Sequence, residues 1–156
     1  LTGEVLPDSL IQKIRNTQRY HVGYHCVRQL TFGMLDMAWH TQTEKIEDIT
    51  AFEQNAISPT QLLPVIDGTL ISSQFSHVFG GGYAAGYYGY KWAEVLDADA
   101  FSLFKEKGIF NREAASSFRE NVLSKGGTEH PMELYVRFRG HKPETRALIE
   151  KMGLGK

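Results

Sequence analysis

The most informative stretch of the sequence is residues 75–92, FSHVFGGGYAAGYYGYKW, in which His77 precedes three glycines and then four tyrosines within eight residues. Tyr83, Tyr87 and Tyr90 are spaced at i, i+4 and i+7, which predicts that their side chains share one face of a helix. We expect this helix to run from about Tyr83 to Lys107 and to end at Gly108.

The remainder of the chain is also patterned as helices. Apolar residues at intervals of three and four predict helices over about 9–14, 22–38, 49–56, 111–122, 131–138 and 143–152. Asp8 or Ser9, Asp48 and Asn111 are the expected N-terminal caps, and Pro131 suits a first helical turn. Residues 65–71 are too short to build a sheet, although the turn at 67–68 could close a small hairpin. The prediction is an all-α fold of six or seven helices with a glycine-rich loop.

Composition places limits on the function. The chain has 156 residues, which suits one domain spanning 1–156. Lys and Arg total 17 against 18 for Asp and Glu, so the basic footprint of a nucleic-acid-binding protein is missing. No apolar run approaches the ~20 residues that cross a bilayer, which argues against a membrane protein. Cys26 is the only cysteine, so no internal disulfide can form and a reducing, cytoplasmic location is expected.

Two short motifs resemble known sites, and neither is complete. His21 and His25 have the i, i+4 spacing of a zinc pair, but Val22 stands where a zinc peptidase has its glutamate. Two ordinary histidines are the preferred interpretation. Gly80-x-Gly82-x-x-Ala85 matches a dinucleotide fingerprint, but no buried strand is expected before it. Nucleotide binding is therefore only a weak alternative.

The tyrosine row has two interpretations. A core stripe would more readily use leucine or isoleucine, because each buried phenol needs a partner for its hydroxyl group. The hydroxyl groups of Tyr83, Tyr87 and Tyr90 could instead donate hydrogen bonds to a substrate and stabilise an oxyanion. From the residues alone the two interpretations are about equal. The other large aromatic side chains here are assigned to packing or to the core: Tyr88, Trp92 and Phe101.

Beyond this stretch, several motifs in order resemble the C-terminal catalytic region of the thimet-oligopeptidase-like zinc metallopeptidases. Within that family the bacterial peptidyl-dipeptidase branch is the most similar. The resemblance covers nearly the whole chain. It is carried by Leu35 to His40, Phe75 to Trp92, Glu94 to Leu96, Gly126-Gly127, Arg137 to Gly140 with Pro143, and Gly153-Leu154.

The resemblance implies the helical C-terminal part of a two-lobed zincin-type metallopeptidase, whose zinc is held by an H-E-x-x-H helix. In that family the motif's glutamate activates the zinc-bound water. His40, His130 and His141 are not followed by glutamate, and the sequence contains no such motif. We therefore expect this chain to be a fragment of a longer protein, which would account for its start at Leu1. The zinc ligands would lie outside it, and the fragment would bind none.

The resemblance also assigns roles to residues of the tyrosine stretch. His77 and Tyr83 match residues that contact the substrate backbone near the scissile bond, and Tyr90 matches the tyrosine that donates to the tetrahedral oxyanion. The further substrate-binding positions are Gly80, Gly81, Gly82 and, less strongly, Tyr87. The glycines match a loop that adjusts around substrate, which suits their permissive backbone.

The expected function is the substrate-binding, oxyanion-stabilising part of a zinc-dependent oligopeptidase or peptidyl-dipeptidase. Its partners would be short peptides and the missing N-terminal part of the same protein. The fragment alone would be inactive. The alternative is a stand-alone helical binding module descended from such an enzyme. An upstream extension of the reading frame that encodes H-E-x-x-H would exclude this alternative.

Overall fold

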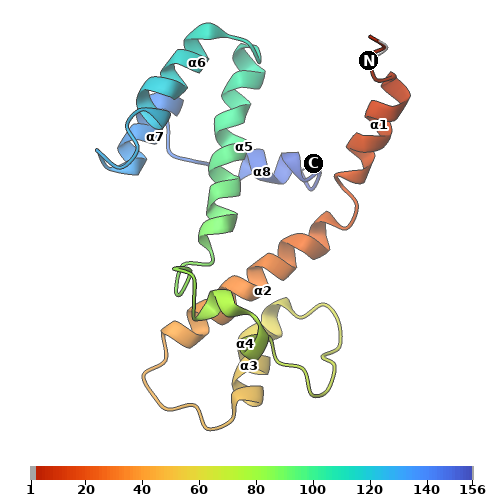
Figure 1. Ribbon diagram of the computed structural model, residues 1–156, viewed down its shortest axis with the longest axis vertical. Helices are drawn as coiled ribbons and strands as arrows, with labels where there is room; N and C mark the ends of the chain where they lie inside the picture. The colour runs from red at the N-terminus through yellow and green to blue at the C-terminus, as the bar shows by residue number, and fades with distance from the viewer. Residues whose placement is uncertain (1–2, 156) are drawn as a thin grey trace. The chain divides into compact units, whose positions relative to one another are not determined.

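The computed structural model describes residues 3–155, which fold into helices joined by turns and loops (Figure 1). Its α-helices are α1 (Asp8–Thr17), α2 (Val22–His40), α3 (Ile49–Ile57), α4 (Ile71–Gln74), α5 (Gly89–Lys107), α6 (Arg112–Phe118), α7 (Pro131–Arg139) and α8 (Arg146–Lys151). No strand occurs within residues 3–155, so the predicted all-α fold is confirmed. Over the same range, no helix combines the length and the apolar character needed to cross a membrane.

The chain divides into two compact units, Leu1–Lys91 and Trp92–Lys156. The boundary between them falls in the first turn of α5. The first unit contains α1 to α4, and the second contains most of α5 together with α6 to α8. Whether the two units act as one domain stays a prediction.

The first unit is built around the C-terminal half of α2. Leu35 and Asp36 on this helix are completely buried. The ring of Phe32 stacks on Phe75 with 4.3 Å between ring centroids, and Trp39 contacts Phe52 of α3 at 4.4 Å. These contacts hold α3 and the segment that follows α4 against α2. In contrast, α1 buries none of its side chains.

A buried glutamate fixes the loop that leads into α4. Glu53 on α3 accepts hydrogen bonds from the backbone N–H groups of Ile71 and Ser72, both at 2.7 Å, and from the Ser72 hydroxyl at 2.6 Å. Trp39 Nε1 donates to the same Ser72 hydroxyl at 2.8 Å. A buried carboxylate is tolerated when its oxygens are hydrogen-bonded in this way, so α4 is held to both α2 and α3.

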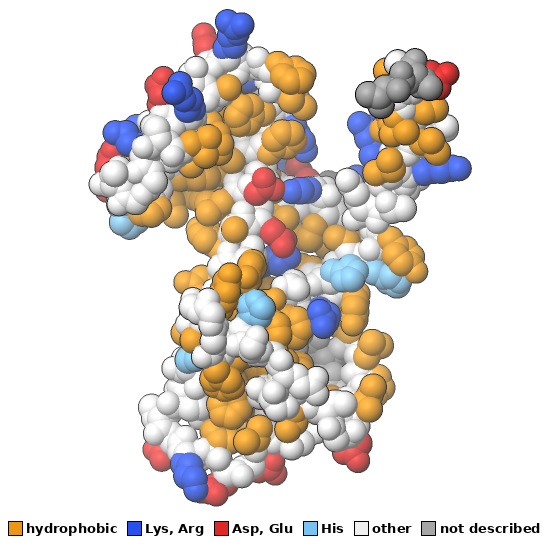
Figure 2. Space-filling model, viewed as in Figure 1, with side chains coloured by type: hydrophobic (Ala, Val, Ile, Leu, Met, Phe, Trp, Pro, Cys, Tyr) orange, Lys and Arg blue, Asp and Glu red, His pale blue; other side chains and the backbone are white. Residues whose placement is uncertain are grey.

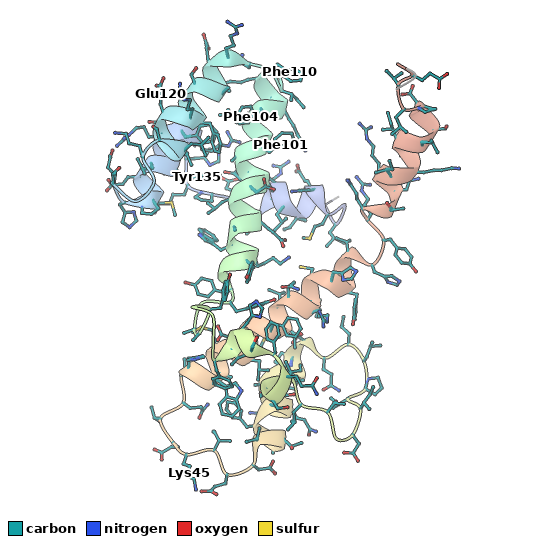
Figure 3. The ribbon with its side chains drawn as sticks, viewed as in Figure 1. Lys45, Phe101, Phe104, Phe110, Glu120 and Tyr135 are labelled. Carbon is teal, nitrogen blue, oxygen red and sulfur yellow. The ribbon has the colours of Figure 1, made fainter. Side chains whose placement is uncertain are left out.

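The second unit has a comparable buried carboxylate. Asp99 of α5 accepts a hydrogen bond from the Tyr135 hydroxyl at 2.6 Å, and Arg139 Nε lies 3.6 Å from the same oxygen. Burial and the neighbouring carboxylate raise the pKa of the Tyr135 phenol. Phe104 and Tyr135, labelled in Figure 3, belong to an aromatic core completed by Phe118 and Phe138.

The predicted helix ends are largely confirmed. Asp48 accepts a hydrogen bond from the backbone N–H of Ala51, and Asn111 accepts one from Ala114, both at 2.9 Å. Pro131 occupies the first turn of α7, and this helix ends at Gly140 with φ +89°. The expected cap of α1 is wrong, because Pro7 occupies the N-cap position and no side chain caps this helix.

Three predicted elements are corrected. The long helix begins at Gly89 and not at Tyr83, because residues 83–88 form turns. The predicted hairpin around 67–68 is a single turn, in which Thr69 N–H donates to the Ile66 carbonyl. The backbone N–H groups of residues 71 and 72, which a paired strand would use, donate to Glu53 instead. The last helix begins at Arg146, three residues after Pro143.

The aromatic residues assigned to packing are also corrected. Trp92 and Phe101 are 42% and 44% exposed, and Tyr88 is 59% exposed. The buried face of α5 is formed instead by smaller or polar side chains: Val95, Ala98, Asp99 and Leu103. Phe101 lies under the ammonium group of Lys105 at 5.6 Å, which is a surface cation–π contact.

Asn111→Ala is expected to destabilise the protein by about 1 kcal/mol, because it removes the side-chain acceptor at the start of α6. Asn55→Ala is the matched control, since Asn55 is exposed in the interior of α3, where alanine is the better helix former. Denaturant unfolding measures both. Equal midpoints for Asn111→Ala and the wild type would contradict the role of the cap.

Candidate active site: the tyrosine cluster

The turn between the glycines and α5 has an unusual backbone. Gly81 and Gly82 adopt φ values of +69° and +78°, which glycine accepts without steric cost. Ala85 adopts φ +56°, a conformation that side-chain-bearing residues rarely take. The chain therefore cannot continue a regular helix back from Gly89 to Tyr83.

A buried aspartate holds this turn in place. Asp36 of α2 is 0% exposed, and its two carboxylate oxygens accept the backbone N–H groups of Ala85 and Tyr87, each at 3.0 Å. The ring nitrogen Nδ1 of His40 lies 3.1 Å from one of these oxygens. Amides that would otherwise bond within a helix are thus turned toward Asp36, which explains the late start of α5.

The predicted tyrosines meet around His77, although they do not share a helix face. The His77 ring centroid lies 5.0 Å from that of Tyr83, 5.8 Å from Tyr87 and 6.3 Å from Tyr90. Tyr83 stacks on Tyr90 at 5.3 Å, and Tyr87 lies 5.2 Å from Tyr90. On its other side His77 stacks on Phe75 at 4.8 Å. We call His77, Tyr83, Tyr87 and Tyr90 the tyrosine cluster.

The three tyrosines differ in exposure. Tyr87 is 7% exposed, and its hydroxyl group donates to Gln29 Oε1 at 2.8 Å. Burial raises the pKa of Tyr87 above its ordinary value. Tyr83 and Tyr90 are 37% and 42% exposed, so their hydroxyl groups can reach a bound molecule. Tyr87 is therefore suited to anchoring the cluster, and the other two to contacting a ligand.

Tyr90 is held in its neutral form. A hydrogen bond with Tyr83, aided by desolvation, raises the pKa of Tyr90 from 10.0 to about 12. Because this folded-state pKa is raised, the stabilisation is complete below pH 10 and is lost as the pH rises through about 12. At neutral pH the Tyr90 hydroxyl is a hydrogen-bond donor.

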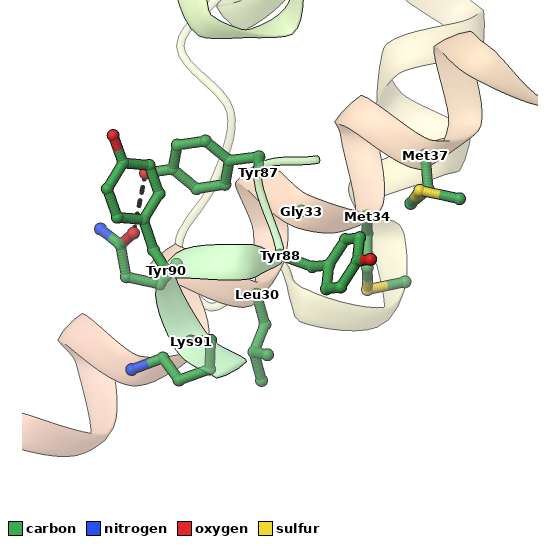
Figure 4. A pocket seen from close by; sticks show the side chains of 9 residues that line it. Leu30, Gly33, Met34, Met37, Tyr87, Tyr88, Tyr90 and Lys91 are labelled. Carbon is green, nitrogen blue, oxygen red and sulfur yellow. Dashed lines mark hydrogen bonds between the residues drawn. The ribbon is translucent and has the colours of Figure 1, made fainter. Parts of the chain in front are cut away.

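An apolar pocket of about 270 Å³ lies beside the cluster, between α2 and the start of α5. Figure 4 shows Tyr87 and Tyr90 on one side of it and Tyr88 on the other, next to Met34. Its remaining lining residues are Gln29, Leu30, Gly33, Met37 and Lys91. Hydrophobic side chains also reach the surface of both units in Figure 2.

The described residues do not fit a zinc ion. Within residues 3–155, no group of three His, Cys, Asp or Glu side chains is arranged to hold a metal. His21 lies before α2 in a left-handed conformation, so it does not share a helix face with His25. Gly80 and Gly82 follow a 3₁₀ turn at Ser76–Val78 and not a strand, so the dinucleotide fingerprint lacks its structural context.

The sequence matches peptidase family M3 across residues 1–154. The chain belongs to this family. Its sequence is 44% identical to oligopeptidase A of Escherichia coli and 39% identical to dipeptidyl carboxypeptidase of the same organism, over 98% of this chain in each case. A chloroplast and mitochondrial oligopeptidase A of Arabidopsis thaliana is 38% identical over the same share. The expected family is confirmed.

The chain spans about a quarter of these M3 relatives, 23% of each bacterial protein and 20% of the plant one. The two bacterial relatives carry the names of an oligopeptidase and of a dipeptidyl carboxypeptidase.

Sequence reasoning missed two residues that organise the cluster. Asp36 and Gln29 lie 49 to 58 positions before the groups that they bind. Polar residues within the apolar pattern of the helix over 22–38 were the available signal, because a polar side chain on a buried helix face needs a partner. The partner itself could not be identified from spacing along the chain.

Tyr83→Phe is expected to lower the pKa of Tyr90 from about 12 toward the ordinary value of about 10, because it removes the hydroxyl group to which Tyr90 is bonded. Tyr24→Phe is the control, since Tyr24 contacts His25 and no member of the cluster. NMR titration of ring-labelled tyrosine measures both. A Tyr90 pKa that is unchanged in Tyr83→Phe would show that the hydrogen bond is not the cause.

Proposed function

We propose that this chain forms the substrate-binding, oxyanion-stabilising part of a zinc-dependent peptidase that hydrolyses short peptides, either as an oligopeptidase or as a peptidyl-dipeptidase. The observation that carries the proposal is the half-exposed, neutral Tyr90 at the edge of an ordered ring cluster, in a chain of peptidase family M3. The names of the relatives in turn support peptides as substrates.

In this proposal Tyr90 acts on the charge that develops during hydrolysis. When water adds to the scissile carbonyl, the carbonyl oxygen becomes an oxyanion. A neutral phenol whose ring is held by neighbouring rings can turn its hydroxyl group from Tyr83 to that oxygen and donate a hydrogen bond to it. Because the charge is present in the transition state and hardly in the bound substrate, this hydrogen bond accelerates the reaction more than it strengthens substrate binding.

The other members of the cluster bind the peptide backbone. His77 and Tyr83 lie against Tyr90 and contact the residues next to the scissile bond. Gly80, Gly81 and Gly82 form a loop without side chains, which allows a peptide to approach the backbone closely. Tyr87 acts mainly by supporting the ring of Tyr90.

The metal and the remaining catalytic groups belong to the longer protein in this proposal. Zinc is the cofactor of the full-length enzyme, and its ligands come from outside residues 3–155, where no suitable group is arranged. This chain would then be the C-terminal part of the catalytic domain. Its expected partners are the rest of that protein and short peptides. A cytoplasmic location also stays a prediction, based on the lone Cys26.

In the full-length enzyme, Tyr90→Phe is expected to lower kcat by roughly 10²–10³-fold, the usual effect of removing one oxyanion donor. KM is expected to change little, because the ring and its packing remain. Tyr88→Phe is the matched control: Tyr88 is 59% exposed, and no ring contact joins it to the tyrosine cluster within the described chain. Steady-state kinetics with a short peptide measures both variants.

The opposite outcome is a Tyr90→Phe enzyme with kcat within about threefold of the wild type, well below the tenfold change that ~1.4 kcal/mol of lost transition-state stabilisation would give. That result would assign Tyr90 to packing. His77→Ala and Tyr83→Phe are expected to change both kcat and KM, since contacts to the substrate backbone serve the bound substrate and the transition state alike.

The isolated 156-residue chain is expected to be helical and inactive, and to retain no stoichiometric zinc after dialysis. The reason is that catalytic zinc needs about three protein ligands, and residues 3–155 do not gather them. Circular dichroism, peptide hydrolysis with added zinc and metal analysis measure these properties. Hydrolysis above background, or one zinc per chain, would refute the assignment of the metal site to another part of the protein.

A further inference from the structure

Asp36 is the one fully buried charged side chain among the described residues, and it bonds the turn through backbone groups. Its carboxylate oxygens accept the backbone N–H groups of Ala85 and Tyr87, and His40 Nδ1 lies 3.1 Å from one of these oxygens. A carboxylate removed from water is costly unless such partners compensate it. The turn therefore depends on a buried carboxylate that is stable only while these partners are present.

We propose that Asp36 is a positioning residue for the peptidase reaction, which sets the placement of the Tyr83 and Tyr90 hydroxyl groups by fixing the turn between them. Ala85 and Tyr87 lie between these two tyrosines in the sequence, and Asp36 binds the amides of both. The inference rests on the function proposed for Tyr90.

Within the turn itself the backbone hydrogen bonds are local: Gly86 N–H donates to the Tyr83 carbonyl at 2.8 Å, and Gly89 N–H donates to the Gly86 carbonyl at 3.0 Å. The segment 80–86 has three glycines near its start and one at its end, so its backbone has many accessible conformations. Ala85 also adopts a left-handed conformation that its side chain disfavours. The two bonds from Asp36 add to these local bonds and tie the turn to α2. Tyr90 is the second residue of α5, three residues beyond Tyr87, so the direction of its ring depends on how the turn is held.

The cluster contacts show what the turn controls. Stacking of Tyr83 on Tyr90, at 5.3 Å and 19° between ring planes, requires the chain to reverse between them. The backbone N–H of Tyr87 donates to Asp36, and its hydroxyl group donates to Gln29. The ring of Tyr87 is therefore fixed at both ends where it packs against Tyr90. If one of the hydrogen bonds between Asp36 and these backbone N–H groups were lost, the rings would remain in contact but in a less defined geometry.

Asp36→Asn is the test variant. It keeps the size of the side chain, but its amide group has one oxygen, so one of the two turn N–H groups faces an NH₂ donor in place of an acceptor. In the full-length enzyme we expect kcat to fall by ~10-fold or more, with KM within about threefold. In a Tyr90→Phe background the same change should lower kcat by a smaller factor, because one of the two hydroxyl groups that it positions is already absent.

Asp99→Asn is the matched control, because Asp99 is also a buried carboxylate but binds Tyr135 and Arg139 and no part of the turn. It is expected to lower the melting temperature while leaving kcat within about threefold. If Asp36→Asn does not fold, Asp36→Glu replaces it in the same cycle. This variant keeps an acidic side chain but lengthens it by one methylene group, which moves both acceptors away from the turn amides, and kcat is expected to fall by ~3–10-fold.

A kcat near that of the wild type in a folded Asp36→Asn enzyme, or an equal loss in both backgrounds, would overturn the positioning role. So would an unchanged kcat in Asp36→Glu, should that variant be needed. NMR titration of Tyr90 separates this inference from the proposed function, since it requires no activity. In Asp36→Asn the pKa of Tyr90 should move from about 12 toward the ordinary 10. An unchanged pKa overturns the positioning role even if Tyr90→Phe confirms the function of Tyr90.

Discussion

The carboxylate of Asp36 is the constraint on which the candidate site depends. It joins the C-terminal half of α2 to a turn about fifty residues later, through the two backbone amides of Ala85 and Tyr87. Burial makes these bonds strong, because no water competes for either partner. Glu53 does the same for the segment that leads into α4. The region 71–87, whose regular structure is limited to α4 and the 3₁₀ turn at Ser76–Val78, is therefore tied to α2 and α3 by two acidic side chains.

The aromatic residues of the site have two roles, support and ligand contact. Phe32, Phe75 and Tyr87 form the supporting layer, with Tyr87 fixed at both ends. His77 and the half-exposed Tyr83 and Tyr90 lie on that layer. A hydrogen-bond donor placed in this manner is already oriented before substrate arrives, which is the condition for stabilising a transition state by electrostatics. A flexible glycine loop next to a rigid ring surface also allows the peptide to adjust while the donor stays fixed.

The sequence was sufficient for features that are decided locally. Asp48 and Asn111 cap their helices as their side chains predict, and Gly140 ends α7 where a left-handed residue is needed. The family was also identifiable, because the motif around His77 is unusual and extends to flanking motifs. The meeting of the tyrosines was predicted for the wrong reason, since helical spacing placed them together whereas the structure brings them together through a turn.

The features that sequence reasoning missed all depend on contacts between distant residues. The start of α5 is set by Asp36, and the failed hairpin by Glu53, neither of which lies near the affected segment. Trp92 and Phe101 were assigned to the core by size, but α5 buries its small side chains and Asp99 instead. Periodicity describes which residues share a face, and it carries no information on which face another element covers.

The most direct test of the central claim is a crystal structure of the full-length enzyme with a peptide analogue whose scissile amide is replaced by a phosphinate. The phosphinate oxygens stand in for the oxyanion of the tetrahedral intermediate. The account predicts that the Tyr90 hydroxyl turns from Tyr83 to one of these oxygens, at about 2.7–3.1 Å, while Asp36 keeps its bonds to the turn. A structure in which Tyr90 stays bonded to Tyr83 and the phosphinate is contacted only by other groups would contradict it.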